Sequence, residues 1–241
     1  MAGTKSLASR SPTPFEFHGS DASNSIPFTV EIPRFETEHM DADGDLVLEV
    51  PYMDENEQPL TKKFVVCSKT LSRSSPVFKK MLFGGFAESK QPEKGGEPWT
   101  VNLPDDDHDA LKVLLDIVHS NFDKVPNSVT DLDDLYHIAV LTDKYDMTHL
   151  LRPWIRQWES PKYEEMPLWD DSREKSQDCF LEKHLWIAWQ FGAQIRLYRL
   201  VRDLAQYSCL DGNGTLASKE DDGSVVLRLK DTLTPPGLYG Q

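Results

Sequence analysis

Acidic residues near the start of the first strand-like segment have a spacing that could bind calcium. Asp41, Asp43 and Asp45 alternate along the chain, as carboxylates do at the opening of an EF-hand loop. That loop also needs Gly at its sixth position and Glu at its twelfth, and here those positions are Leu46 and Tyr52. We therefore expect a solvated acidic turn here and no metal site.

The histidine, cysteine and glycine spacings indicate no catalytic or cofactor site. The seven His and three Cys contain no H-E-x-x-H motif and no pair at zinc spacing. Cys67 has no evident base or oxyanion donors, so a buried structural thiol is expected. Residues 212–217 fit G-x-G-x-x-A but follow a predicted helix, which favours a turn. We expect no enzyme activity, no cofactor and no metal.

Two tryptophan pairs and one arginine stripe could contact ligands. Trp154 and Trp158 are four residues apart, and Trp186 and Trp189 are three apart, a spacing that usually fills a core. An exposed docking face is the alternative. Arginine recurs at every third position over 196–202 and could meet phosphate, but in an acidic protein a solvated helix face is favoured.

The apolar periodicity predicts a small sheet and several helices. Strand spacing occurs over Asp45–Val50, Lys63–Val66 and Trp99–Leu103. A helix is predicted at 76–85, where Pro stands in the first turn and paired glycines follow the last. A second is predicted at 105–118, which opens with an acidic run. Apolar stripes at helical spacing predict further helices at 132–139, 147–158, about 179–191 and about 193–209. Pro153 should kink its helix or shift its start. The order of elements is that of an α+β domain.

Composition divides the chain into four segments. Residues 1–40 are rich in Ser, Thr and Pro and predict a disordered tail whose later part could dock as an extended strand. Residues 41–160 form the main domain, and 161–178 a polar linker. Residues 179–241 are predicted to be helical, with a short terminal strand at 225–229.

The charge and hydropathy of the chain narrow its partners. Lys plus Arg is 26 against 40 Asp plus Glu, a net charge of −14. Such a chain repels phosphate backbones, so nucleic acid is not an expected partner. No apolar run approaches the roughly 20 residues that span a bilayer, so no membrane association is expected. Three cysteines without a C-x-x-C pair fit a reducing compartment, and we expect a cytoplasmic and/or nuclear protein.

Three runs of sequence resemble the BTB/POZ domain family. They are DLVLEV, FVVCSKTLSRSSPVFKKMLFGGFAES and IAVLTDKYD, at residues 45–50, 64–89 and 138–146. The resemblance covers about residues 41–160 and implies a small three-stranded sheet flanked by a helical cluster, here with an appended C-terminal helical region. With LLRPW at 150–154 and LWIAWQFG at 185–192, the whole chain resembles BTB proteins of filamentous fungi.

The resemblance implies an intracellular protein-interaction module and no enzyme. Family members dimerise, bind transcriptional corepressors, or link substrates to cullin-type ubiquitin ligases. The favoured interpretation is an adaptor that recruits partners or substrates to such a ligase. The alternative is a scaffold or transcriptional co-regulator without ligase activity.

Two pairs of residues are candidate contacts under this resemblance. Phe86 and Glu88 match the hydrophobic-x-Glu motif with which family members bind a cullin, although Phe86 could instead cap the preceding helix with Glu88 solvated. The family's charged dimer pocket would include Asp45 and a basic residue. Cys67-Ser68 stands where family members usually have His-Lys or His-Arg. Lys69, one position further on, is the remaining candidate for the basic residue of the pocket. A monomer or weak homodimer is expected.

Overall fold

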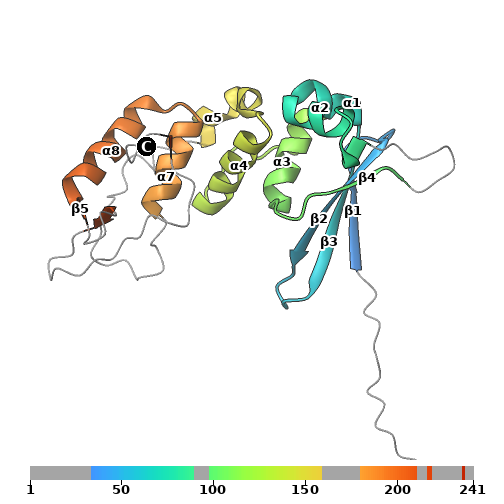
Figure 1. Ribbon diagram of the computed structural model, residues 1–241, viewed down its shortest axis with the longest axis horizontal. Helices are drawn as coiled ribbons and strands as arrows, with labels where there is room; N and C mark the ends of the chain where they lie inside the picture. The colour runs from blue at the N-terminus through green and yellow to red at the C-terminus, as the bar shows by residue number, and fades with distance from the viewer. Residues whose placement is uncertain (1–33, 90–97, 159–179, 211–215, 219–234, 237–241) are drawn as a thin grey trace, which may run out of the picture. The chain divides into compact units, whose positions relative to one another are not determined.

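Alternating apolar residues form a mixed four-stranded sheet. The computed structural model describes residues 34–89, 98–158, 180–210, 216–218 and 235–236. The strands are β1 (Arg34–His39), β2 (Leu46–Met53), β3 (Pro59–Val66) and β4 (Thr100–Asn102), in the order β1-β3-β2-β4. β2 and β3 are antiparallel, whereas β1 runs parallel to β3 and β4 parallel to β2 (Figure 1). Leu48 lies opposite both Phe64 and Val101, so the buried side chains align across the sheet.

The sheet has one strand more than the three predicted. β1 lies in the segment 1–40, whose later part was expected to be able to dock as an extended strand. β1 pairs with β3 over all six of its residues, and two ion pairs add to this backbone pairing: Glu36 with Lys62 at 2.8 Å, and Glu38 with Lys112 at 2.6 Å. Such a strand lacks the apolar alternation by which the other three were recognised.

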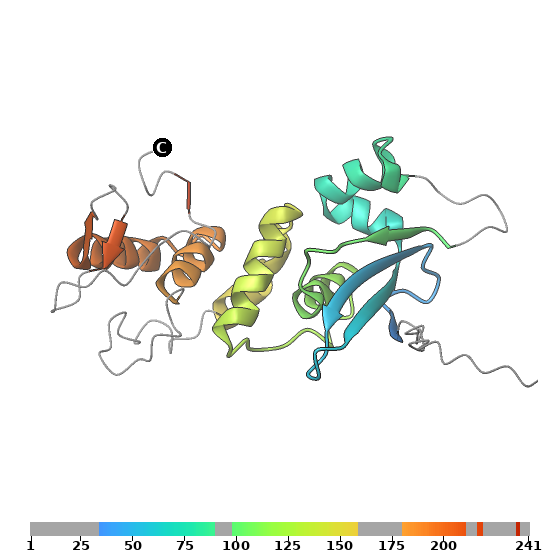
Figure 2. The same ribbon diagram turned by 60° about the horizontal axis from the view of Figure 1, so that its bottom comes forward.

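Side-chain caps set the starts of the helices that cover the sheet. α1 (Ser68–Ser74) is followed by α2 (Pro76–Phe83), with Pro76 at the first helical position as predicted. α3 (His108–Val118) and α4 (Leu132–Lys144) begin after aspartates whose carboxylates accept backbone N–H groups of the first turn. α3 lies against β2 and β3, and α4 packs on α3 (Figure 2).

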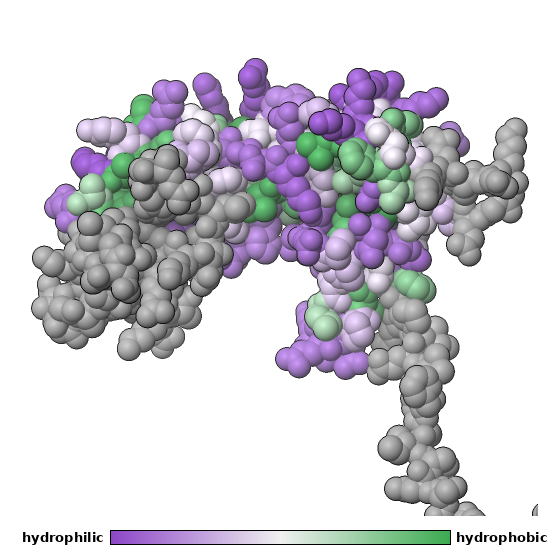
Figure 3. Space-filling model, viewed as in Figure 1, coloured by the Kyte–Doolittle hydropathy of each residue, from purple (hydrophilic) through white to green (hydrophobic). Residues whose placement is uncertain are grey.

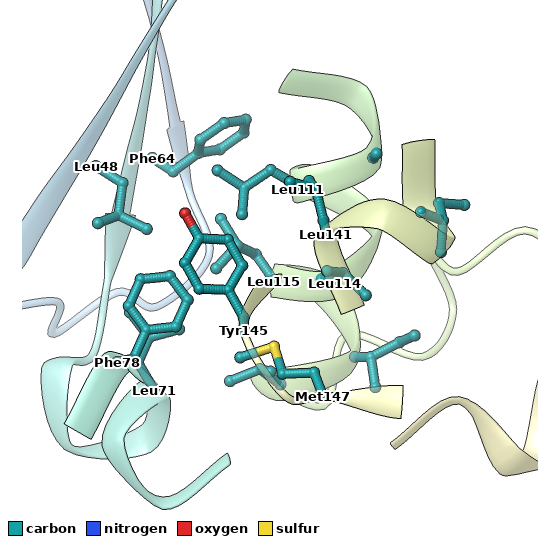
Figure 4. Packing of buried hydrophobic residues seen from close by; sticks show 14 of the residues in the cluster. Leu48, Phe64, Leu71, Phe78, Leu111, Leu114, Leu115, Leu141, Tyr145 and Met147 are labelled. Carbon is teal, nitrogen blue, oxygen red and sulfur yellow. The ribbon is translucent and has the colours of Figure 1, made fainter. Parts of the chain in front are cut away.

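Tyr145 connects α4, α2 and the loop before α3. Its ring stacks on Phe78 with the centroids 4.2 Å apart, and its hydroxyl donates a hydrogen bond to the buried Asp106 carboxylate. Its carbonyl accepts a 2.6 Å hydrogen bond from Ser75, whose hydroxyl oxygen also accepts from the Phe78 N–H and so caps α2. Figure 4 shows the ring between the sheet residues and the helices. Burial, with the nearby Asp106 carboxylate, raises the pKa of Tyr145 far above its ordinary value.

Further helices follow the sheet domain. A 3₁₀ turn at Thr148–Leu151 precedes α5 (Arg152–Trp158), so Pro153 lies at the start of a helix, as its ring requires. α7 (Phe180–Gln190) and α8 (Gln194–Tyr207) lie where two helices were predicted, and the chain turns between them at Gly192 with φ +72°. α7 packs on α4, and its Trp186 and Ile187 join the main hydrophobic core.

The remaining predictions concern the C-terminal region and the tryptophans. A short antiparallel pair, β5 (Ser208–Leu210) and β6 (Leu216–Ser218), follows α8 and was not predicted. The linker 161–178 and the expected strand at 225–229 lie outside the described residues.

Trp158 and Trp186 are buried and Trp154 is half-buried, but Trp189 is 43% exposed at the end of α7, so the core assignment is wrong for Trp189.

The different burial of the α5 tryptophans gives a stability prediction. Trp158 is fully buried and its indole N–H donates to the Pro126 carbonyl at 2.8 Å, whereas Trp154 is half-buried and its ring lies against those of Trp158 and Phe122. Trp158→Ala should lower the free energy of unfolding by about 3–5 kcal/mol, and Trp154→Ala by clearly less. Urea unfolding followed by circular dichroism measures both. Equal losses would contradict the assigned packing.

Candidate partner-binding site

Two glycines end α2 and turn the chain outward. The N–H of Gly84 donates to the Lys80 carbonyl at 2.7 Å, and a Cβ on Gly84 would lie only 2.3 Å from that oxygen. Gly85 has φ +84°, in the left-handed region that other residues rarely adopt. The backbone here therefore requires both glycines, and it places the residues after α2 in a tight turn.

Ser89 closes this turn from its far end. The Ser89 hydroxyl donates to the Met81 carbonyl at 2.8 Å and accepts from the Gly85 N–H at 3.1 Å. The Ser89 N–H donates to the Phe86 carbonyl, also at 3.1 Å, within the 3₁₀ turn Ala87–Ser89. One side chain thus joins the end of α2 to both halves of residues 84–89, which we call the Gly-Gly turn.

Trp99 fastens the same turn to the sheet. It precedes β4 and is only 5% exposed. Its indole N–H donates to the Glu88 carbonyl at 2.7 Å, and its ring meets Phe83 edge-on with the centroids 6.0 Å apart. The Gly-Gly turn is therefore held both by α2 and by the strand side of the domain.

The fastened turn presents Phe86 and Glu88 together on the surface. Phe86 is 56% exposed, and a side chain at Gly84 would meet its ring at 3.2 Å, so the ring lies over the turn. Glu88 is exposed, and its carboxylate pairs with no cation among the described residues. The exposure of Phe86 disfavours the alternative in which it caps α2 onto the core. Phe83, 46% exposed, adds a second aromatic side chain beside them.

Asp45 and Lys69 do not pair with each other in the described part of the chain. The Asp45 carboxylate accepts hydrogen bonds from the Ser68 N–H and the Ser68 hydroxyl, both at 2.7 Å. Asp45 therefore caps α1, whose N-cap residue, Cys67, offers no side-chain cap. The Lys69 side chain is exposed. Both oxygens of the carboxylate that a charged dimer pocket would use thus accept hydrogen bonds from Ser68.

The sequence did not indicate two residues of this site, the exposed Phe83 and the buried Trp99. Phe83 lies outside the apolar stripe of α2, and an apolar residue in such a position indicates an exposed contact surface. The stripe itself is formed by Val77, Phe78, Met81 and Leu82. Trp99 was assigned only to a strand. Its bond is to a backbone carbonyl, an acceptor that every residue provides, so no sequence pattern marks it.

Comparison with known families assigns the domain. A family model for the BTB/POZ domain matches residues 45–154. The chain contains a BTB/POZ domain. The matched residues run from β2 into α5 and include β2, β3 and β4 of the mixed sheet and the helices that cover it, whereas β1 precedes them. No curated protein matches the chain. BTB/POZ domains are protein–protein interaction modules and often dimerise.

The described residues contain neither a metal-binding cluster nor a helix suited to a membrane. No group of three or more His, Cys, Asp or Glu side chains there is placed to hold a metal ion. None of the helices in that part of the chain has the length and apolar character needed to cross a membrane.

The Trp99–Glu88 hydrogen bond should keep the Gly-Gly turn of the BTB/POZ domain rigid. Trp99→Phe removes the indole N–H and keeps an aromatic ring beside Phe83. We expect a loss of about 1 kcal/mol in unfolding free energy and faster amide exchange at Gly85 and Ser89.

Trp154→Phe is the matched control, because the Trp154 indole N–H makes no hydrogen bond in the described chain. Urea unfolding and hydrogen exchange followed by NMR measure both variants. Exchange at Gly85 and Ser89 that is unchanged in Trp99→Phe would show that the bond does not restrain the turn.

Proposed function

We propose that this chain is an adaptor whose BTB/POZ domain binds the N-terminal domain of a cullin-type ubiquitin ligase scaffold, in the cytoplasm or nucleus. The observation that carries the proposal is the joint exposure of Phe86 and Glu88 on a turn fixed by the Ser89 and Trp99 hydrogen bonds. This surface coincides with the hydrophobic-x-Glu position that the family resemblance implied. The adaptor would recruit other proteins to the ligase for modification.

The chemistry of the two side chains suits an interface. An aromatic ring has few rotatable bonds, so its burial against a partner loses little conformational entropy and gains a large apolar contact. The exposed Glu88 carboxylate, which has no cation partner among the described residues, can accept charge-assisted hydrogen bonds from a partner's basic side chain, which would fix orientation. Because the turn is already ordered, binding requires little rearrangement.

The appended helices support the same function. α7 contacts α4 through Trp186 and Ile187 in the main core, and Lys183 of α7 pairs with Asp133 of α4 at 2.6 Å. The helical pair is therefore anchored to the BTB/POZ domain by both apolar and ionic contacts. Ligase adaptors of this family often carry such a pair, which extends the cullin contact.

Substitution of the two exposed side chains tests the proposal. Phe86→Ala and Glu88→Ala should each weaken binding to the cullin N-terminal domain of the host by about 1–3 kcal/mol, measured by calorimetric titration. Both side chains are solvent-exposed, so the far-ultraviolet circular dichroism and unfolding midpoint should stay as in the wild type.

Phe35→Ala is the matched control for this titration. Phe35 is 51% exposed, but it lies on β1, at the opposite edge of the sheet from β4. Its removal should leave the affinity unchanged. Absence of binding by folded wild-type protein would end the adaptor proposal, and it would favour a scaffold or transcriptional co-regulator.

Self-association of the chain is expected to be weak. The Asp45 carboxylate is bound by Ser68, and the face of α1 that is not buried is polar or charged. Like charges on an acidic chain also repel. Sedimentation velocity should therefore show a monomer, or a dimer that dissociates at micromolar concentration. A dimer that persists at nanomolar concentration and high salt would contradict this prediction.

A further inference from the structure

α1 and α2 form a basic surface on an acidic chain. Residues 68–83 contain no Asp or Glu, and all four of their basic side chains are exposed: Lys69, Arg73, Lys79 and Lys80. The rest of the chain keeps 22 of the 26 basic residues against all 40 acidic ones. The two helices contact each other, and Figure 3 shows hydrophilic side chains over them beside hydrophobic ones. We call these four residues the α1–α2 cations.

The α1–α2 cations differ from the lysines of the neighbouring elements in having no ionic partner. Lys62 and Lys63 of β3, Lys112 of α3 and Lys144 of α4 each pair with a carboxylate, at 2.5–2.8 Å. In the part of the chain that the structure describes, none of the α1–α2 cations forms an ion pair. Arg73 and Lys80 lie in the last turns of α1 and α2, where a cation offsets the helix dipole, but no carboxylate of the described residues neutralises any of the four charges.

The first turns of α1 and α2 contain no acidic residue of their own, unlike those of α3 and α4. α3 carries Asp109 in its first turn and α4 carries Asp133 and Asp134, where acidic side chains offset the helix dipole. α1 and α2 have no acidic residue in their first turns, and Lys69 occupies that place in α1. The Asp45 carboxylate meets α1 at Ser68 and leaves the Lys69 ammonium exposed.

We propose that the α1–α2 surface binds an acidic segment of a partner protein, with an apolar side chain of that segment on Phe83. The charge of the surface is complementary to such a segment, and Phe83, 46% exposed at the end of α2, supplies an apolar contact next to Lys79 and Lys80. A long nucleic acid would meet the repulsion of the whole acidic chain, whereas a short peptide meets mainly the charges within a Debye length, about 8–10 Å. The surface shares Phe83 with the candidate cullin contact but does not include Phe86 or Glu88, and the proposal and its test do not rest on cullin binding.

Peptide titration of the full chain tests this proposal. The probe is a fluorescein-labelled peptide of Asp and Glu with interspersed Leu and Phe, and its control has Asn and Gln in place of the acids. Fluorescence anisotropy should show binding of the acidic peptide alone, weakened about tenfold when salt rises from about 0.05 to about 0.3 M. The double variants Lys69→Glu/Arg73→Glu and Lys79→Glu/Lys80→Glu should each weaken binding by tenfold or more.

A matched double variant separates a local surface from net charge. Lys124→Glu/Arg156→Glu makes the same change in charge at two exposed residues outside α1 and α2, and it should alter the affinity less than threefold. An equal loss in this control, or equal binding of the amide peptide, would overturn the proposal. So would tighter binding of an oligothymidine through the same four residues, which would assign the surface to nucleic acid. A homodimer that the Lys69→Glu/Arg73→Glu variant dissociates would make a second copy of the chain the occupant, and would also overturn it.

Discussion

The burial of Tyr145 is the interaction on which the arrangement of the BTB/POZ domain depends. The residue follows α4, yet its ring stacks on Phe78 of α2, its hydroxyl binds Asp106 before α3, and its carbonyl accepts from Ser75, the cap of α2. A buried phenol and a buried carboxylate are each costly without a partner, so these groups stabilise the core only in this mutual arrangement. One side chain thereby fixes where α2 begins relative to the other helices.

The position of α2 in turn determines the exposed surface. α2 spans only Pro76–Phe83, so its start at Ser75 and its end at Gly84 are separated by about two turns. Beyond that end, Ser89 and Trp99 hold the chain by hydrogen bonds to backbone groups, and the exposed side chains are left free of the packing. The restrained atoms and the exposed atoms are therefore different: the backbone of the Gly-Gly turn is held by hydrogen bonds, while the Phe86 ring and the Glu88 carboxylate face solvent. The same division holds on α1 and α2, where Leu71 and Phe78 are buried and the cations are outside.

The sequence predicted the elements that local signals determine. It did not predict features that depend on distant charges or on hydrogen bonds to backbone acceptors. The alternation in β2 and β3, Pro76 at the start of α2 and the acidic run before α3 are local, and each led to the right element. β1 is polar and is held by backbone pairing with β3 and by ion pairs such as Glu36–Lys62, whose partners are 26 residues apart, so its own sequence gives little sign of a strand. At the candidate site, the hydrophobic-x-Glu motif indicated Phe86 and Glu88 as candidate contacts. The fixing role of Trp99 and the binding of Asp45 by Ser68 required the folded arrangement.

The central claim, that the Gly-Gly turn is the contact with a cullin, is tested most directly by site-specific photo-crosslinking. A photoreactive benzoylphenylalanine in place of Phe86 keeps an aromatic side chain at the proposed contact, and the same replacement of Phe35 marks the opposite edge of the sheet. With the cullin N-terminal domain of the host, we predict a crosslink from position 86 and none from position 35. A complex that crosslinks from position 35 and not from position 86, or a folded protein that forms no complex, would contradict the account.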